Sequence, residues 1–196
     1  MVYYHVSRLL NEGQILTHKT KNNYQYCRYI EECDVSSCEN LLKCCMHLRD
    51  RNVFNITGRR AEKWCCEALF EYIRKTKYPN MPSRIWGIFL SKEYGDACVF
   101  LNNYRKPTTD KNGNQLIGHI YEIDVPENKT VFVFDMSLYT EIDEFLQSCL
   151  KNNTMNENLY DCVCDKICEY WESHLSINYT KEYLIDCDLV VGRQVL

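Results

Sequence analysis

Residues 119–134 read HIYEIDVPENKTVFVF, and this stretch decides the fold class. It contains two runs rich in β-branched and aromatic residues, 119–125 and 130–134, with Pro126-Glu127-Asn128 between them as a turn. The sequence therefore predicts two strands in succession with no helix between them. A doubly wound parallel sheet alternates strands with helices, so this order favours an α+β fold with mixed or antiparallel sheets and flanking helices.

The segments on either side of this pair predict further strands and several helices. The other strands are expected over residues 2–8, 84–90 and 182–195, the last as one strand or two. Helices are expected after Ser36, after Thr57, from Ser91 to about residue 104, and twice between residues 138 and 170. No internal repeat or linker-like stretch interrupts this order, so residues 1–196 are expected to form a single domain.

Two local patterns refine the expected helices. Ser36 and Glu39 have the spacing of a capping box, which predicts that Ser36 caps the first helix. In the first helix after residue 136, an apolar stripe at helical spacing predicts the buried face. That stripe consists of Leu138, Ile142, Phe145 and Cys149.

The composition excludes several classes of protein. Hydrophobic residues make up 45% of the chain and charged residues 26%, which rules out a disordered chain. The net charge of −4 disfavours a protein that functions mainly by binding nucleic-acid phosphates, because such proteins are usually basic. No apolar run approaches the roughly 18 residues that a membrane span needs. The sequence therefore predicts a folded protein with no membrane partner.

Thirteen cysteines are present, and an odd number cannot pair completely within one chain. No basic region followed by an apolar one occurs at the N-terminus, so we expect a reducing, cytoplasmic environment. The cysteines are then expected to be mostly free thiols that pack as small apolar residues. No C-x-x-C spacing occurs in the cysteine-rich stretches, and no metal site is predicted.

Three short segments are more informative together than apart. The first is Tyr4-His5-Val6-Ser7-Arg8, the second is Gly87-Ile88-Phe89-Leu90-Ser91, and the third is Lys181-Glu182-Tyr183-Leu184-Ile185-Asp186. In this order they resemble the signature segments of ADP-ribosyltransferases of the diphtheria-toxin and poly(ADP-ribose) polymerase type. Those enzymes are known as the H-Y-E group, and this chain would be an H-F-E variant. The resemblance implies an ADP-ribosyltransferase-like fold of two packed sheets, with NAD as substrate.

The resemblance implies a role in NAD binding for each matching residue. His5 would bond the adenosine ribose, the backbone of Val6 would meet the nicotinamide amide, and Ser7 would help to hold the ribose. Phe89 would stack on the nicotinamide ring, a role that needs only an aromatic face. Phe100 would supply the opposite face, and Asp96 stands where a serine often binds the nicotinamide amide.

Glu182 would be the catalytic carboxylate, with His5 as the second catalytic residue. The resemblance implies that Glu182 bonds the 2′-hydroxyl of the nicotinamide ribose. Its negative charge would stabilise the oxocarbenium-like sugar while the glycosidic bond breaks. Thr180 stands two residues before Glu182, where arginine-modifying relatives place a glutamate. The acceptor of ADP-ribose, a protein or a nucleic acid, is left open.

Three alternatives stand beside this interpretation. An NAD glycohydrolase would use the same residues with water as the acceptor. An RNA 2′-phosphotransferase shares the fold but needs several basic residues, which the acidic balance disfavours. A catalytically silent module could keep the fold and bind NAD, ADP-ribose or a protein partner. The departures at Val6, Phe89 and Asp96 from the usual pattern keep that last alternative open.

Overall fold

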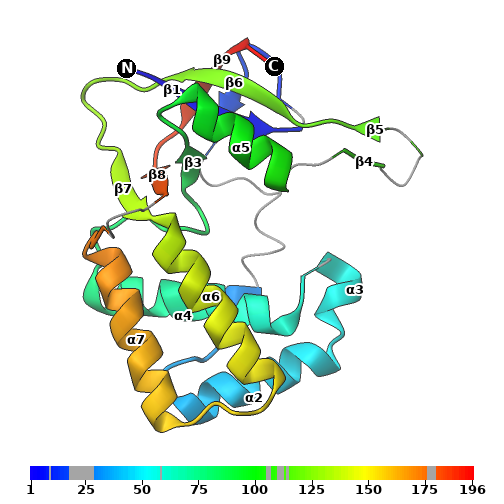
Figure 1. The fold of residues 1–196 in the computed structure, drawn as a ribbon, viewed down its shortest axis with the longest axis vertical. Coiled ribbons are helices and arrows are strands. Elements are labelled where there is room, and N and C mark those ends of the chain that lie inside the picture. The colour runs from blue at the N-terminus through cyan, green and yellow to red at the C-terminus, as the bar shows by residue number, and fades with distance from the viewer. Residues whose placement is uncertain are drawn as a thin grey trace. The chain divides into compact units, whose positions relative to one another are not determined.

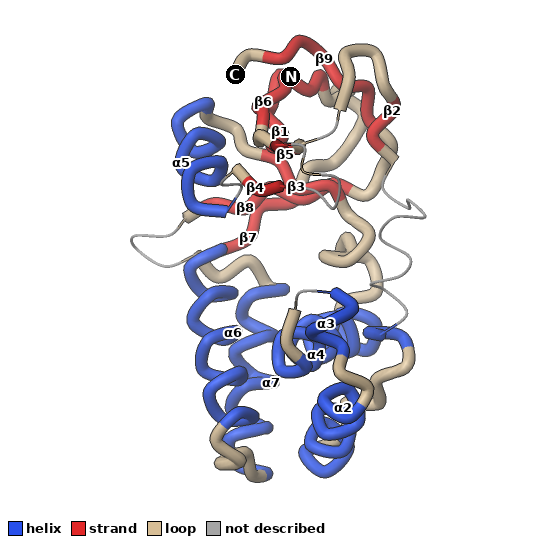
Figure 2. Tube along the Cα trace, turned by 90° about the vertical axis from the view of Figure 1, so that its right-hand side faces the viewer, coloured by secondary structure: helices blue, strands red, loops and turns tan. Residues whose placement is uncertain are grey.

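The computed structural model describes residues 1–8, 10–17, 29–57, 59–104, 107–109, 113, 115–175 and 180–196. The chain divides into two compact units, each assembled from segments distant in sequence. The first unit comprises Met1–His18, Gly87–Val133 and Glu182–Leu196. The second comprises Lys19–Trp86 and Phe134–Lys181. Strands dominate the first unit and helices the second (Figure 1 and Figure 2). The single domain over residues 1–196 stays a prediction.

The first unit is built on antiparallel strands. A four-stranded sheet has the order β1 (Val2–Ser7), β6 (His119–Asp124), β9 (Leu189–Gln194) and β2 (Ile15–Leu16). A three-stranded sheet has the order β3 (Ile88–Leu90), β8 (Lys181–Ile185) and β7 (Phe132–Asp135), and a short ladder joins β4 (Thr108–Thr109) to β5 (Gln115–Leu116). The predicted α+β class is confirmed, and so are the two successive strands β6 and β7 that decided it.

One apolar cluster joins the two larger sheets of this unit. It contains side chains from both sheets because each strand turns alternate residues to the core. The four-stranded sheet contributes Tyr3, Tyr121, Ile123, Leu189 and Val191, and the three-stranded sheet contributes Ile88, Leu90, Tyr183 and Ile185. The other face of the four-stranded sheet packs on α5 (Tyr94–Tyr104), where Val6 and Ile120 meet Ala97.

The second unit is helical. Its elements are α2 (Cys38–Asp50), α3 (Val53–Thr57), α4 (Ala61–Lys77), α6 (Met136–Lys151) and α7 (Glu157–Trp171). Helix α4 is buried on most of its surface, and Trp64, Leu69 and Phe70 are at most 1% exposed. Phe70 packs edge-on against Tyr170, whose ring stacks on Phe134. Trp171 donates from its indole nitrogen to the Phe70 carbonyl at 3.2 Å, which satisfies a polar group that burial would otherwise make costly.

The strand predicted over residues 84–90 is shorter in the structure. β3 begins at Ile88, and Arg84 lies in a turn before it. The Arg84 guanidinium donates to the Tyr170 hydroxyl at 2.5 Å and lies 3.7 Å from the centre of the Tyr139 ring. The Ser83 hydroxyl accepts from the backbone N–H groups of Ile85 and Trp86, so these groups bond within the turn rather than to a strand.

The predicted N-cap was wrong by one residue. Ser37 is the N-cap of α2, and its hydroxyl accepts from the backbone N–H of Asn40 at 3.2 Å. Ser36 instead donates its hydroxyl to Asp34 at 2.7 Å, and Glu39 pairs with Lys43. Asp34 competes for Ser36 because an aspartate side chain bonds readily to groups two residues further along the chain.

Replacing Ser37 by alanine is therefore expected to lower the free energy of unfolding by about 1 kcal/mol. The matched variant Ser36→Ala should change it by less than about 0.5 kcal/mol, because that exposed hydroxyl caps no helix. Urea unfolding followed by circular dichroism measures both values. Equal losses in the two variants would contradict the assignment of the cap.

The buried face of α6 differs from the predicted stripe at two positions: Tyr139 is buried in place of Leu138, and Leu146 in place of Phe145. Phe145 is 41% exposed, and the buried residues include Tyr139, Ile142, Leu146 and Cys149. Both stripes have three- and four-residue spacings, so periodicity alone does not choose between them. Tyr139 decides the choice, because its ring packs 5.0 Å from Phe70 and its hydroxyl donates to Glu67 at 2.7 Å.

One pair of cysteines departs from the expectation of free thiols. Cys33 and Cys44 form a disulfide, with Cα atoms 5.7 Å apart. That separation is ordinary for a disulfide, and α2 brings the pair together although 11 residues separate them in sequence. The other ten described cysteines are free, and half of them are buried, as in Cys45, Cys65 and Cys66. Cys27 lies outside the described residues.

No helix among the described residues is long and apolar enough to cross a membrane.

Candidate functional site

β1 and β3 meet edge to edge at a single residue pair. Tyr4 and Ser91 exchange both backbone hydrogen bonds, each 2.8 Å long, in an isolated antiparallel bridge. The sequence predicted a helix from Ser91, but the backbone of Ser91 forms this bridge, and α5 begins three residues later. We call the residues around this bridge the β1–β3 junction: Tyr4, His5, Val6, Phe89 and Ser91. Two of the three family-like segments, 83 residues apart, therefore meet here.

His5 ties its strand to β3 through its side chain. The Nδ1 atom lies 2.8 Å from the carbonyl oxygen of Phe89. A carbonyl oxygen only accepts, so Nδ1 carries the proton and donates. In the neutral imidazole Nε2 is then an acceptor, the form that suits a hydroxyl donor such as a ribose. The ring is half-buried, which limits its freedom to turn.

The backbone of Val6 also faces this junction. In an antiparallel pair, alternate residues turn their N–H and C=O toward and away from the partner strand. Both backbone groups of Tyr4 bond to Ser91 and therefore face away from β6. Val6, two residues later in the strand, has the same orientation, so its N–H and C=O also face away from β6. Ile120, which stands opposite Val6 in β6, directs its backbone groups away from β1. Its N–H donates to the Leu196 carbonyl and its carbonyl accepts from the Val195 N–H, each at 2.9 Å. Val6 therefore presents a donor and an acceptor side by side at the junction, while its side chain is buried under α5.

Phe89 and Glu182 lie on one face of the three-stranded sheet. β3 and β8 pair with Phe89 opposite Leu184 and Leu90 opposite Tyr183. Ile88, Leu90, Tyr183 and Ile185 point into the core, so the alternating residues Phe89, Leu184 and Glu182 share the other face. Phe89 and Glu182 are diagonal neighbours there, which separates them by roughly 7–8 Å, with the Cβ atoms somewhat closer. Phe89 is half-buried, and Glu182 is 8% exposed.

Two polar side chains that the sequence did not single out lie next to Ser7. His119 stands opposite Ser7 in the β1–β6 ladder, so both side chains share the face that carries His5. Gln194 of β9 donates from its amide nitrogen to Nδ1 of His119 at 3.1 Å, which leaves the proton of the neutral ring on Nε2. The predicted strand over residues 119–125 could have identified His119, because alternation along a strand puts His119 and Tyr121 on one face. The partner Gln194, 75 residues away, was visible only in the fold.

The two remaining predicted residues are on α5. Asp96 is exposed in the first turn of this helix, where a carboxylate complements the helix dipole. Phe100 is half-buried and packs against the cluster of Val6, Ala97 and Ile120. The structure thus brings His5 and Phe89 into contact and puts Phe89 and Glu182 on one sheet face. It joins Phe100 to the buried side chain of Val6, whereas Asp96 faces solvent.

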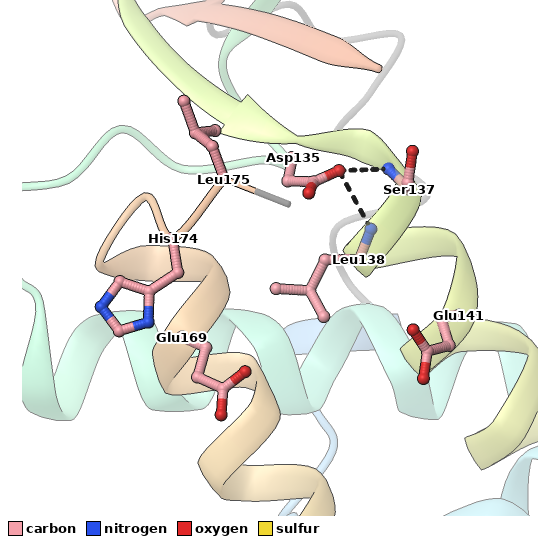
Figure 3. Close-up of a pocket in the computed structure, with 7 residues that line it drawn as sticks. All are labelled: Asp135, Ser137, Leu138, Glu141, Glu169, His174 and Leu175. Carbon is pink, nitrogen blue, oxygen red and sulfur yellow. Dashed lines mark hydrogen bonds between the residues drawn. The ribbon is translucent and has the colours of Figure 1, made fainter. Parts of the chain in front are cut away.

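A separate hollow lies in the second unit, at the start of α6 (Figure 3). It has a volume of about 250 Å³, which is smaller than most ligand pockets. Asp135 lines it, but its carboxylate accepts from the backbone N–H groups of Ser137 and Leu138, as the dashed lines in Figure 3 show. Glu141 pairs with Lys166. These carboxylates therefore have structural partners, and the hollow is a weaker candidate than the junction.

Within the described part of the chain, no three or more His, Cys, Asp or Glu side chains are grouped as a metal site. The β1–β3 junction offers backbone donors and acceptors, an imidazole and an aromatic ring, and the carboxylate of Glu182 lies on the neighbouring strand β8.

These features define an α+β protein with antiparallel sheets and a polar site where β1 meets β3. The chain belongs to the family described as "Protein of unknown function (DUF2441)", whose model matches residues 3–195. A search of curated proteins finds no match.

Proposed function

We propose that this protein is an NAD-dependent ADP-ribosyltransferase that works in the cytoplasm. It cleaves the bond between nicotinamide and ribose in NAD and transfers ADP-ribose to a macromolecular acceptor. The first unit carries the proposed site, with Glu182 and His5 as catalytic residues. NAD is the substrate, and the acceptor is a protein or a nucleic acid.

The observation that carries this proposal is the meeting of three distant segments. Tyr4 pairs with Ser91, His5 bonds Phe89, and Phe89 lies opposite Leu184 in the ladder with β8. Segments that resemble one enzyme family by chance have no reason to be neighbours in space. Their adjacency supports a common site for one ligand.

The chemistry of the junction suits a nicotinamide nucleotide. A primary carboxamide offers both a donor and an acceptor, and Val6 presents the complementary pair on its backbone. An aromatic side chain such as Phe89 stacks on a nicotinamide ring. The departure from the family pattern at Val6 leaves this backbone accessible, because the Val6 side chain points away under α5. Ser7 and His5 supply polar groups for ribose hydroxyls.

Glu182 would act on the charge that develops in the reaction. When the C–N bond breaks, its electron pair leaves with neutral nicotinamide and the ribose carbon becomes positive. A buried carboxylate opposes that charge more strongly than an exposed one, because less water screens it. Glu182 is 8% exposed, which favours this role. The acceptor then bonds the ribose carbon and loses its proton to solvent.

Labelled NAD incubated with the protein and a cell extract tests the proposal. We expect label in the protein or nucleic-acid fraction that depends on the added protein. Label only in free ADP-ribose would identify a glycohydrolase, the closest alternative. No consumption of NAD, with or without binding, would contradict catalysis and leave a silent module.

Phe89→Ala is expected to weaken NAD binding by about 1–3 kcal/mol, the range for losing one stacking face. Phe89→Tyr should bind nearly as well as the wild type, because it keeps the face. Leu90→Ala is the matched control on the same strand: it points into the core and should cost stability by about 2–5 kcal/mol. Thermal melts with and without NAD separate the two effects. If Phe89→Ala has a melting temperature as low as that of Leu90→Ala and an unchanged affinity for NAD, Phe89 is only a core residue.

A further inference from the structure

The Cys33–Cys44 disulfide lies in the wall of a hollow in the second unit. This hollow has a volume of about 270 Å³ and is also lined by Tyr29, Asp34, Lys43 and His47. Both sulfurs belong to half-buried residues. The bond is therefore open to a small molecule, unlike a disulfide enclosed in a core.

The position of Cys44 on α2 explains this accessibility. The buried face of the helix is formed by Cys38, Leu41, Cys45 and Leu48, which are at most 4% exposed. Cys44 is outside this stripe. Cys45, its neighbour in the chain, is 2% exposed and lies in the core. The same helix thus carries one accessible sulfur and two protected ones.

Two basic side chains line the hollow beside this sulfur. His47 is three residues after Cys44, a spacing that places the two side chains on one face of a helix. Lys43 and His47 both line the hollow, and both are exposed. Of the neighbouring acids, Glu32 pairs with Arg51 and Glu39 with Lys43, and the Asp34 carboxylate accepts from the Ser36 hydroxyl and the Asn40 amide. A charged imidazole next to a thiol stabilises its thiolate. His47 in its charged form therefore makes Cys44 the better leaving group and, in the reverse direction, the readier nucleophile.

We propose that Cys33 and Cys44 form a thiol–disulfide exchange site for small monothiols of the glutathione class. The thiolate of the small thiol attacks Sγ of Cys33, a mixed disulfide forms, and the electron pair of the broken bond leaves on Sγ of Cys44. A second small thiol attacks the outer sulfur of the mixed disulfide and releases the Cys33 thiolate. The two protein thiolates take the protons of the two small thiols, and the products are the dithiol and one oxidised small disulfide. This proposal does not depend on the proposed transferase activity.

The bond has a structural consequence. It ties the segment before α2 to the helix, next to Val35, whose carbonyl accepts from the Tyr160 hydroxyl at 2.7 Å. The disulfide closes a loop between residues 11 apart, and such loops restrict the unfolded chain. We expect the reduced protein to melt about 5–10 °C below the oxidised protein.

The test equilibrates the intact protein in buffers with different ratios of reduced to oxidised glutathione, followed by alkylation and mass mapping. Cys33 and Cys44 should change together from protected to alkylated as the ratio rises. The exposed Cys162 should be alkylated at every ratio at which it carries no glutathione. The buried Cys65 and Cys66 should be alkylated only after the protein is denatured. The melting temperature should fall over the same range of ratios.

Three variants test the roles of the two sulfurs. Cys44→Ser should accumulate one glutathione on Cys33, because the resolving sulfur is missing. His47→Gln should slow the return of the disulfide by about 3–10-fold. Cys162→Ser is the control and should behave as the wild type. A pair that stays protected at every ratio until denaturation, or one that is alkylated even in oxidised glutathione, would overturn the proposal.

Discussion

Replacing Glu182 by glutamine is expected to reduce the turnover of NAD by about 100-fold or more. The amide keeps the size and hydrogen-bonding capacity of the side chain but removes the negative charge that the oxocarbenium-like state needs. Because glutamine keeps the size of this buried side chain, the fold and the affinity for NAD should change little. Release of nicotinamide measures turnover, and a thermal shift with NAD measures binding.

Glu122→Gln is the matched control for this experiment. Glu122 is also a strand carboxylate of the first unit, but it pairs with Arg193 at 3.0 Å on β9. Its replacement should leave turnover unchanged. Turnover of Glu182→Gln within about threefold of the wild type would remove Glu182 from the mechanism. A low melting temperature would instead assign it a structural role.

Replacing Arg84 by methionine is expected to lower the free energy of unfolding by about 3–5 kcal/mol. Arg84 is 7% exposed, donates to Tyr170, covers the Tyr139 ring, and lies 3.8 Å from a Glu67 carboxylate oxygen. Methionine fills much of the volume but leaves the Glu67 carboxylate, whose side chain is 14% exposed, with one cation fewer. Urea unfolding of both proteins measures the loss.

A double-mutant cycle isolates the cause. Glu67→Gln in the Arg84→Met background removes the charge that the first change left uncompensated. The double variant should therefore recover part of the lost stability, by roughly 1 kcal/mol or more. If the two losses simply add, the ion pair contributes nothing beyond packing.

The same network predicts how stability depends on pH. Burial alone raises the pKa of Glu67, but Arg84, Lys63 and the Tyr139 hydroxyl outweigh it and hold the pKa below its usual 4.5. A carboxyl whose folded pKa is lowered stabilises the protein above its unfolded pKa and loses that contribution as the pH falls through the folded pKa. The difference between wild type and Arg84→Met should thus be largest above about pH 5 and narrow in more acidic solution.

Some elements of this fold were predictable because their signals are local. The two strands after residue 118 followed from residue types and a proline turn, and β6 and β7 confirm them. The helices α6 and α7 followed from apolar periodicity. Where two local solutions were nearly equal, prediction failed: Ser36 and Ser37 both suit a cap, and Leu138 and Tyr139 both start a stripe. Asp34, which bonds Ser36 and Asn40, decided the first case, and Phe70 of α4, which packs on Tyr139, decided the second.

The amino-acid sequence by itself determined the α+β class and the residue types of the candidate site: an imidazole, an aromatic ring and a carboxylate on three strands. Only the tertiary structure decided that these strands meet. The single bridge between Tyr4 and Ser91 turns the Val6 backbone to the junction, and Gln194 orients His119 across the sheet. The disulfide likewise depends on α2, which brings Cys44 to Cys33. The physical reason is the same each time: hydrogen bonds and sulfur bridges form between groups that are close in space, and sequence separation carries no information about that closeness.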